Sequence, residues 1–124
     1  MDRITLTIPR ERPFHGVAHL VLGGLALRMN VTLEHLEDLQ LALDGLLEQD
    51  ESDGEVTVEL GLDGDVLETV VGPFEHDSLQ AALTSGNGDL GLRRVLETVA
   101  DTVAVTDRDG AQWVELTKTV KRIG

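Results

Sequence analysis

The chain has 124 residues and no cysteine, and its 23 Asp and Glu residues outnumber its 10 Lys and Arg residues, which gives a net charge of −13. That length suits a single domain over residues 1–124, and the lack of thiols excludes disulfides, thiolate metal sites and cysteine nucleophiles. The negative charge disfavours nucleic acid and anionic membrane surfaces as partners. No apolar run approaches the ~20 residues of a membrane helix and no secretory leader opens the sequence, so we expect a cytoplasmic protein.

Alternating apolar and polar residues predict a first strand over residues 4–8, which Pro9 ends. Apolar residues then recur at helical spacing and predict a helix over residues 12–29. The Gly23-Gly24 pair inside this helix costs about 2 kcal/mol relative to two alanines. We interpret the pair as a point of close helix packing, with a flexible point used in binding as the alternative. Thr32 is the expected N-cap of a second helix, which leads into a polar turn at residues 49–54.

The second half is predicted to begin with a β-hairpin, because Asp63-Gly64 lies between two β-rich runs, residues 56–62 and 66–71. Residues 72–88 show no sustained pattern, and we expect a long, lid-like loop with one helical turn at residues 78–83. A third helix near residues 90–99 and a final two-stranded hairpin follow. This order predicts an α+β fold, with a mixed, mostly antiparallel sheet of about five strands and three main helices on one face.

Three segments resemble the histidine-kinase-like ATPase (GHKL) superfamily, and best of all its single-domain group of anti-sigma factors and serine-protein kinases. Residues 4–9 (ITLTIP) resemble the first strand of that group, and residues 38–44 (DLQLALD) resemble the run that leads into its metal-binding helix. Residues 90–96 (LGLRRVL) resemble its second glycine box and the helix that follows. The similarity covers nearly the whole chain in order, so it implies the histidine-kinase-like ATPase fold.

The nucleotide motifs depart from the family pattern at several positions. The resemblance places the family's catalytic or water-positioning Glu at Gly45, which has no side chain to move a proton, and its Mg²⁺-binding Asn at Gln49, whose amide is one methylene further out. The adenine-binding Asp falls on Thr69 or Val70, and neither is a carboxylate. The glycine box that follows is shortened to Gly72, Pro73 and Phe74.

The second glycine box is partly retained. Residues 86–91 (GNGDLG) match the pattern G-x-G-x-x-G, which includes Gly88 and Gly91 and is plausible as an anion-binding helix start. Asp89 lies where the resemblance implies a small residue, and we interpret it as a helix cap. The alternative is that its carboxylate occupies the phosphate site and repels a triphosphate.

Other candidate sites are weaker. His15 and His19 share a helix face at a spacing that zinc can use, but no acidic residue within the turn supplies a third ligand, and we interpret both as surface histidines. His35 and His76 receive no role. The acidic run at residues 50–54 fails the EF-hand template and is interpreted as a solvated turn. No nucleophile elbow of the G-x-S-x-G type occurs.

Together these features predict an anti-sigma-factor-like regulator that acts by protein–protein interaction in transcriptional partner switching, without a catalytic residue, a metal or a cofactor. The alternatives are a working serine kinase that uses ATP and Mg²⁺, and a regulatory domain that binds a small molecule in the old nucleotide cleft. The resemblance implies a sigma factor or an anti-anti-sigma protein as partner, and a possible homodimer. It also implies that the partner meets the face around the first strand and helix, where the candidate residues are Arg3, Arg10, Arg12, Phe14 and Arg28.

Overall fold

A computed structural model of the chain describes residues 2–28, 31–49, 54–84 and 92–119. In chain order the elements are β1 (Asp2–Pro9), the 3₁₀ helix η1 (Arg12–Phe14), α1 (His15–Arg28), α2 (Leu33–Gln49), β2 (Glu55–Asp63), β3 (Val66–Phe74), α3 (His76–Thr84), α4 (Leu92–Val99), β4 (Thr102–Arg108) and β5 (Ala111–Thr119). None of the described helices is long and apolar enough to cross a membrane.

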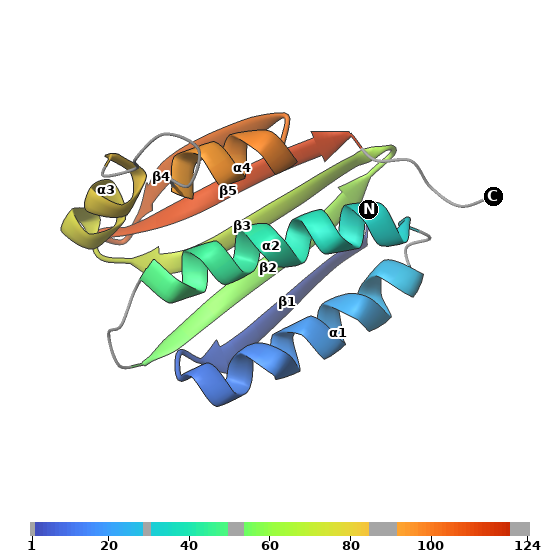
Figure 1. The fold of residues 1–124 in the computed structure, drawn as a ribbon, viewed down its shortest axis with the longest axis horizontal. Coiled ribbons are helices and arrows are strands. Elements are labelled where there is room, and N and C mark those ends of the chain that lie inside the picture. Colours follow the sequence, from blue (N-terminus) through green and yellow to red (C-terminus); the bar gives the residue numbers. More distant parts are fainter. Residues whose placement is uncertain (1, 29–30, 50–53, 85–91, 120–124) are drawn as a thin grey trace.

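The strands form one sheet in the order β1-β2-β3-β5-β4, and every pairing in it is antiparallel. Figure 1 shows α1, α2 and α4 lying side by side across one face of this sheet. The predicted α+β fold with five strands and helices on one face is therefore confirmed, and the sheet is wholly antiparallel rather than mixed.

Period-two alternation explains why these segments become strands. Ile4, Leu6 and Ile8 of β1 lie in register with Leu60, Val58 and Val56 of β2, so one face of the pair is continuously apolar. The same face of the central strands β3 and β5 carries Leu67, Val71, Val114 and Leu116, all at most 5% exposed. The core lies between this face and the helices, where Ala42, Leu43, Leu46, Leu47 and Leu96 are also buried.

Both hairpins turn on glycine, but in different ways. Asp63 pairs with Val66, so the first loop is Gly64-Asp65, and Gly64 has a φ of +61° at the first loop position. The Asp-Gly signal therefore marked the hairpin correctly but placed its loop one residue early. In the second hairpin Asp109 and Gly110 both have positive φ, at 53° and 83°, as a two-residue type I′ turn requires.

Residues 72–88 are not one long loop. Residues 72–74 complete β3, and α3 extends over His76–Thr84, where Leu79 and Leu83 are buried one helical turn apart. The expected single turn is thus a full helix, because tertiary burial of these two leucines stabilises a segment too short to show a periodic pattern. Residues 85–88 lie outside the described residues.

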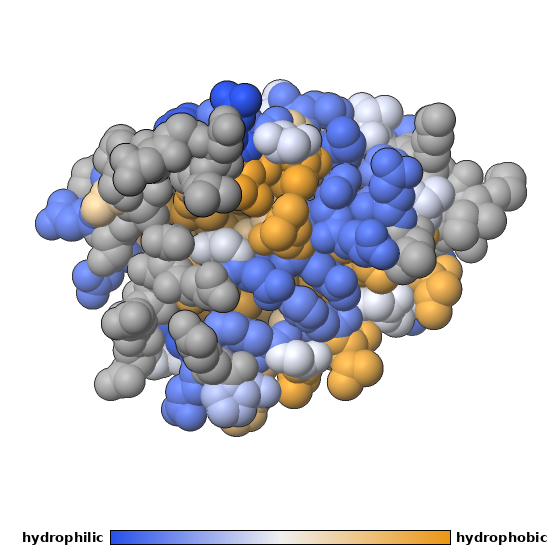
Figure 2. All heavy atoms as spheres, viewed as in Figure 1, coloured by the Kyte–Doolittle hydropathy of each residue, from blue (hydrophilic) through white to orange (hydrophobic). Residues whose placement is uncertain are grey.

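The Gly23-Gly24 pair does not serve close packing within the chain. No heavy atom that the structure describes lies within 4 Å of a Cβ built at either glycine, apart from their own helix neighbourhood. The packing interpretation is therefore wrong for this chain. Figure 2 shows apolar surface on the helix-bearing side at the lower right, over the position that α1 has in Figure 1.

The face of the sheet opposite the helices has its own layer of large side chains. The Arg3 guanidinium lies over Gly61 and the Trp113 indole lies over Gly72; a Cβ on these glycines would come within 3.2 and 2.5 Å of those groups. The Arg108 guanidinium stacks 4.8 Å from the centre of the Trp113 ring. Carboxylate oxygens of Glu59 lie 3.6 Å from Arg3 and 3.2 Å from Arg108, which links the two arginines across the sheet.

Candidate functional site

Gly45 lies on the side of α2 that meets α4. A Cβ built on Gly45 would lie 2.9 Å from Cδ1 of Leu92, the first residue of α4, and Leu92 is 6% exposed. The space into which a side chain at position 45 would extend is therefore occupied by an aliphatic group. Gln49 is the last residue of α2, and its side chain lies outside the described part of the chain.

Thr69 and Val70 point to opposite sides of β3, as neighbouring strand residues must. Thr69 faces α2 and is 3% exposed. Val70 is 5% exposed but lies outside the main core, on the face that bears Trp113. Of the two candidates for the adenine-binding position, only Thr69 therefore faces the space between the helices and the sheet, and its hydroxyl is neutral.

The shortened glycine box at the end of β3 is occupied by packing within the chain. Trp113 covers Gly72, and Phe74 is buried at 3% exposure. The Arg10 guanidinium donates a hydrogen bond to the Pro73 carbonyl oxygen and lies 5.5 Å from the centre of the Phe74 ring. In this chain the glycine thus makes room for an indole ring. Gly88, Asp89 and Gly91 lie outside the described residues.

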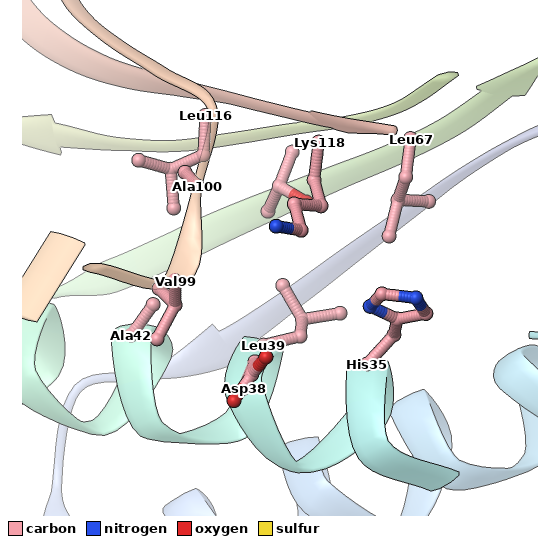
Figure 3. Close-up of a pocket in the computed structure, with 10 residues that line it drawn as sticks. His35, Asp38, Leu39, Ala42, Leu67, Val99, Ala100, Leu116 and Lys118 are labelled. Carbon is pink, nitrogen blue, oxygen red and sulfur yellow. The ribbon is translucent and has the colours of Figure 1, made fainter. Parts of the chain in front are cut away.

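A small pocket opens between α2 and the central strands, toward the amino end of α2 (Figure 3). Its volume is about 20 Å³, enough for about one water molecule and far too small for a purine. Most of the lining is aliphatic, and the Lys118 ammonium points into it, 3.4 Å from an Asp101 carboxylate oxygen. The lining residues are His35, Asp38, Leu39, Ala42, Leu67, Thr69, Val99, Ala100, Leu116 and Lys118.

Sequence reasoning missed this pocket. The one available signal was the alternation of side chains along the last strand. Lys118 shares the inward-facing side of β5 with Val114 and Leu116, where a charged residue is unusual. Among the predicted nucleotide-site residues whose side chains the structure describes, only Thr69 lines the pocket.

The candidate partner-binding residues do not form one patch. Arg3 lies on the uncovered sheet face, where it pairs with Glu59 and also with Glu68 at 3.2 Å. Arg28 is exposed at the far end of α1 from η1. Around η1 the structure brings together Arg10, Arg12 and Phe14; Phe14 is 37% exposed, and the side chain of Arg12 is not described.

The two histidines on α1 have separate partners. Nε2 of His15 lies 3.1 Å from the Arg10 carbonyl oxygen, whereas Nε2 of His19 lies 2.7 Å from Oδ1 of Asp44 on α2. Within the described residues no group of three or more His, Asp or Glu side chains is arranged to hold a metal ion. The acidic turn at residues 50–53 lies outside that set.

An antiparallel five-stranded sheet with its helices on one face is the architecture of the histidine-kinase-like ATPase class. The chain is 32% identical to serine-protein kinase RsbW of Bacillus velezensis, over 95% of this chain and 86% of the relative. It is 29% identical to serine-protein kinase RsbW of Bacillus subtilis, over 94% of this chain and 85% of that one. The chain belongs to the RsbW family, which confirms the resemblance to the anti-sigma group.

A solved structure supports the fold independently. The crystal structure of the RsbU and RsbW domains of Rv1364c from Mycobacterium tuberculosis superposes with a TM-score of 0.71 at 14% identity, over 98% of this chain and 33% of the longer chain. The chain matches no established family profile.

Proposed function

We propose that this chain is a cytoplasmic anti-sigma-factor-like regulator that sequesters a protein partner in transcriptional partner switching, without binding ATP and without kinase activity. The observation that carries the proposal is the position of Leu92, which leaves little room for a side chain at Gly45. The family's carboxylate is replaced by hydrogen at position 45, and a Cβ built there would lie only 2.9 Å from a methyl group of the buried Leu92.

Two further positions support the loss of nucleotide binding. Thr69, which faces the helix layer, offers a neutral hydroxyl where the family has a charged acceptor for adenine. Gln49 has a side chain one methylene longer than the family's Mg²⁺-binding Asn. If each defect costs about 1.4 kcal/mol, three of them lower affinity roughly a thousandfold. Arg10 binds the Pro73 carbonyl oxygen and lies over the Phe74 ring, so the residues of the shortened glycine box are used in packing within the chain.

The partner is proposed to be a sigma factor or an anti-anti-sigma protein, and the chain is proposed to form a homodimer. We place the partner surface around η1 (Arg12–Phe14), where the Phe14 ring is exposed, with Arg28 and Arg3 as outlying positive charges. Arg10 supports this surface through Pro73 and Phe74. Reversing the charge of Arg12 should therefore slow association without affecting the fold, whereas reversing that of Arg10 should also destabilise the protein.

Calorimetry with ATP and Mg²⁺ at pH 7.5 tests the nucleotide part of the proposal. We expect no binding at micromolar nucleotide. A low-micromolar dissociation constant, or nucleotide that copurifies with the protein, would overturn it in favour of the kinase alternative.

A reconstruction series sharpens the test. The Gly45→Glu, Gln49→Asn double variant should gain no ATP binding, because Leu92 crowds the Cβ of any side chain at position 45. Adding Leu92→Ala to this double variant opens the space beside position 45. The matched control adds Leu41→Ala instead, at an exposed position of α2. ATP binding by the double variant alone would show that Leu92 is no obstacle.

A further inference from the structure

The small pocket between α2 and the central strands carries charges of both signs. Asp38 lines it from α2 and Lys118 lines it from β5, and Figure 3 shows the Lys118 ammonium directed into the space between helix and sheet. Lys118 pairs with Asp101 at 3.4 Å. Within the part of the chain that the structure describes, Asp38 forms no ion pair or hydrogen bond. One carboxylate of the pocket is therefore left without a counter-charge from these residues.

The inner end of the pocket holds a buried hydroxyl. Thr69 is 3% exposed, lies opposite Leu116 on the inward face of β3, and lines the pocket. Across residues 2–28, 31–49, 54–84 and 92–119, no group forms a hydrogen bond with this hydroxyl. Buried polar groups in proteins are nearly always hydrogen-bonded. The Thr69 hydroxyl therefore indicates a partner that enters the pocket from outside the chain.

The remaining lining is largely aliphatic and encloses a small space. Leu39 and Ala42 lie on the α2 side of it, and Val99 and Leu116 lie on the other side. The volume of about 20 Å³ holds one group of about the size of a water molecule or a methyl group. A ligand can therefore place one small apolar group inside, while its charged atoms stay near the partly exposed Lys118.

The charges limit the class of ligand. A simple anion would pair with Lys118 but would be repelled by the carboxylates of Asp38 and Asp101, and a simple cation would pair with Asp38 but would be repelled by Lys118. A zwitterion gives each charge a partner of opposite sign. Its carboxylate can also accept a hydrogen bond from the Thr69 hydroxyl. An α-amino acid with a small aliphatic side chain has these charges and fits the enclosed volume.

We propose that this pocket binds a small aliphatic α-amino acid of the size of alanine. Its ammonium group pairs with Asp38, its carboxylate binds Lys118 and Thr69, and its methyl group lies among the aliphatic residues. The site is separate from the position of the family's carboxylate, because Asp38 precedes Gly45 by seven residues, about 10 Å along α2. The inference goes beyond the proposed function and does not depend on it, since neither ATP nor a protein partner is involved.

Calorimetry of the full chain with L-alanine at pH 7.5 tests the site. We expect a Kd below about 1 mM, and a thermal midpoint that rises with the concentration of L-alanine. Propionate and ethylamine have the same carbon chain but one charged group each, and both should bind at least about 10-fold more weakly. L-phenylalanine should not bind, because its ring exceeds the volume. No binding of L-alanine at about 10 mM would overturn the proposal.

Asp38→Asn tests the ammonium contact, because it removes the charge and keeps the shape. It should weaken L-alanine binding at least about 10-fold and should not weaken propionate binding, since propionate has no ammonium group. The matched control is Glu37→Gln, which makes the same change in net charge at an exposed neighbour on α2 and should leave L-alanine binding unchanged. Equal losses in the two variants would contradict the contact with Asp38.

Thr69→Val distinguishes a ligand contact from a structural role. The substitution replaces a hydroxyl that has no described partner by a methyl group, so the thermal midpoint without ligand should stay the same or rise. Affinity for L-alanine should nevertheless fall about 5-fold. Lys118→Met should abolish binding of both L-alanine and propionate, and circular dichroism checks that each variant is folded. Unchanged L-alanine affinity in Thr69→Val and Lys118→Met would overturn the assignment of the site.

Discussion

The two faces of the sheet bury their residues by different means. The helix-bearing face buries aliphatic side chains from nearly every element, and its central residues, such as Leu46, Leu96 and Val114, have no exposed surface. The opposite face has no covering helix among the described residues. There Trp113 and Arg3 lie over Gly72 and Gly61, and Glu59 joins Arg3 to Arg108.

This difference separates two sources of stability in one sheet. The helix side depends on volume, because a close-packed interior loses both transfer energy and contacts when atoms are removed. The uncovered side depends on glycines that lack a side chain, because its indole ring and guanidinium group fit only over bare backbone. Deletions should therefore damage the first face most, and additions should damage the second.

The largest effect is expected on the helix side. Leu96→Ala should lower the free energy of unfolding by about 3–4 kcal/mol, because it leaves a cavity at a fully buried position. Urea denaturation followed by circular dichroism measures the loss. Leu41→Ala, at a position 54% exposed on α2, is the control and should change stability by less than about 0.5 kcal/mol. Equal losses in the two variants would contradict the burial of Leu96.

The uncovered face should respond to an added methyl group instead. Gly72→Ala should cost about 2 kcal/mol, because the new Cβ overlaps the indole of Trp113, which has little freedom to move. Gly61→Ala should cost much less, since the atom it meets is the mobile end of Arg3. In a double-mutant cycle, Trp113→Ala should remove most of the Gly72→Ala penalty. Independent effects of the two substitutions would rule out the contact.

A smaller effect is expected from the ion pairs on the same face. Glu59→Gln removes the carboxylate shared by Arg3 and Arg108 and should cost about 0.5–1 kcal/mol at low salt. Because the arginines are partly exposed, the difference should shrink at 1 M salt, where the screening length falls to about 3 Å. A loss that is independent of salt would mean that Glu59 acts through packing.

The smallest effect concerns the joint between α4 and β4. The backbone N–H of Thr119 donates to Asp101 at 2.8 Å, and this bond, aided by Lys118, lowers the pKa of Asp101 below 3.8 although desolvation opposes the shift. A depressed native pKa means that the carboxylate stabilises the fold above about pH 4 and that this contribution is lost as the pH falls further. Asp101→Asn should therefore flatten the acid limb of the stability–pH curve slightly. An unchanged acid limb would indicate that the bond to Thr119 contributes nothing.

Sequence patterns predicted most of the fold because the signals were local. Alternation in residues 4–8 and 56–62, and the leucines of α2, each require only neighbours in the chain. Residues 76–84 were missed as a helix because Leu79 and Leu83 become informative only once the core that receives them exists. The Gly64-Asp65 loop differed from the predicted Asp-Gly loop because strand register, not the dipeptide, decides which residues close a hairpin.

The candidate site was less predictable because its decisive contacts are non-local. Sequence showed that Gly45 lacks a carboxylate, but not that Leu92 occupies the space beside it. The sequence left Thr69 and Val70 as equal candidates for the adenine-binding position. The pleat of β3 places them on opposite faces of the sheet. The sequence grouped five residues as one partner surface, although Arg3 and Arg28 lie far from η1 in the fold, because linear proximity does not determine which face a residue occupies.

The strand order has a consequence for how the protein is made. β5 is the last strand in chain order but lies inside the sheet, between β3 and β4. Until β5 has emerged from the ribosome, β3 has an unpaired edge and β4 has no partner, so β1, β2, β3 and the first helices are the elements that can assemble earlier. The many contacts between strands distant in sequence favour slow closure of the sheet. During this interval the nascent chain depends on its own charge, or on a chaperone, to keep the open edge of β3 from pairing with another chain.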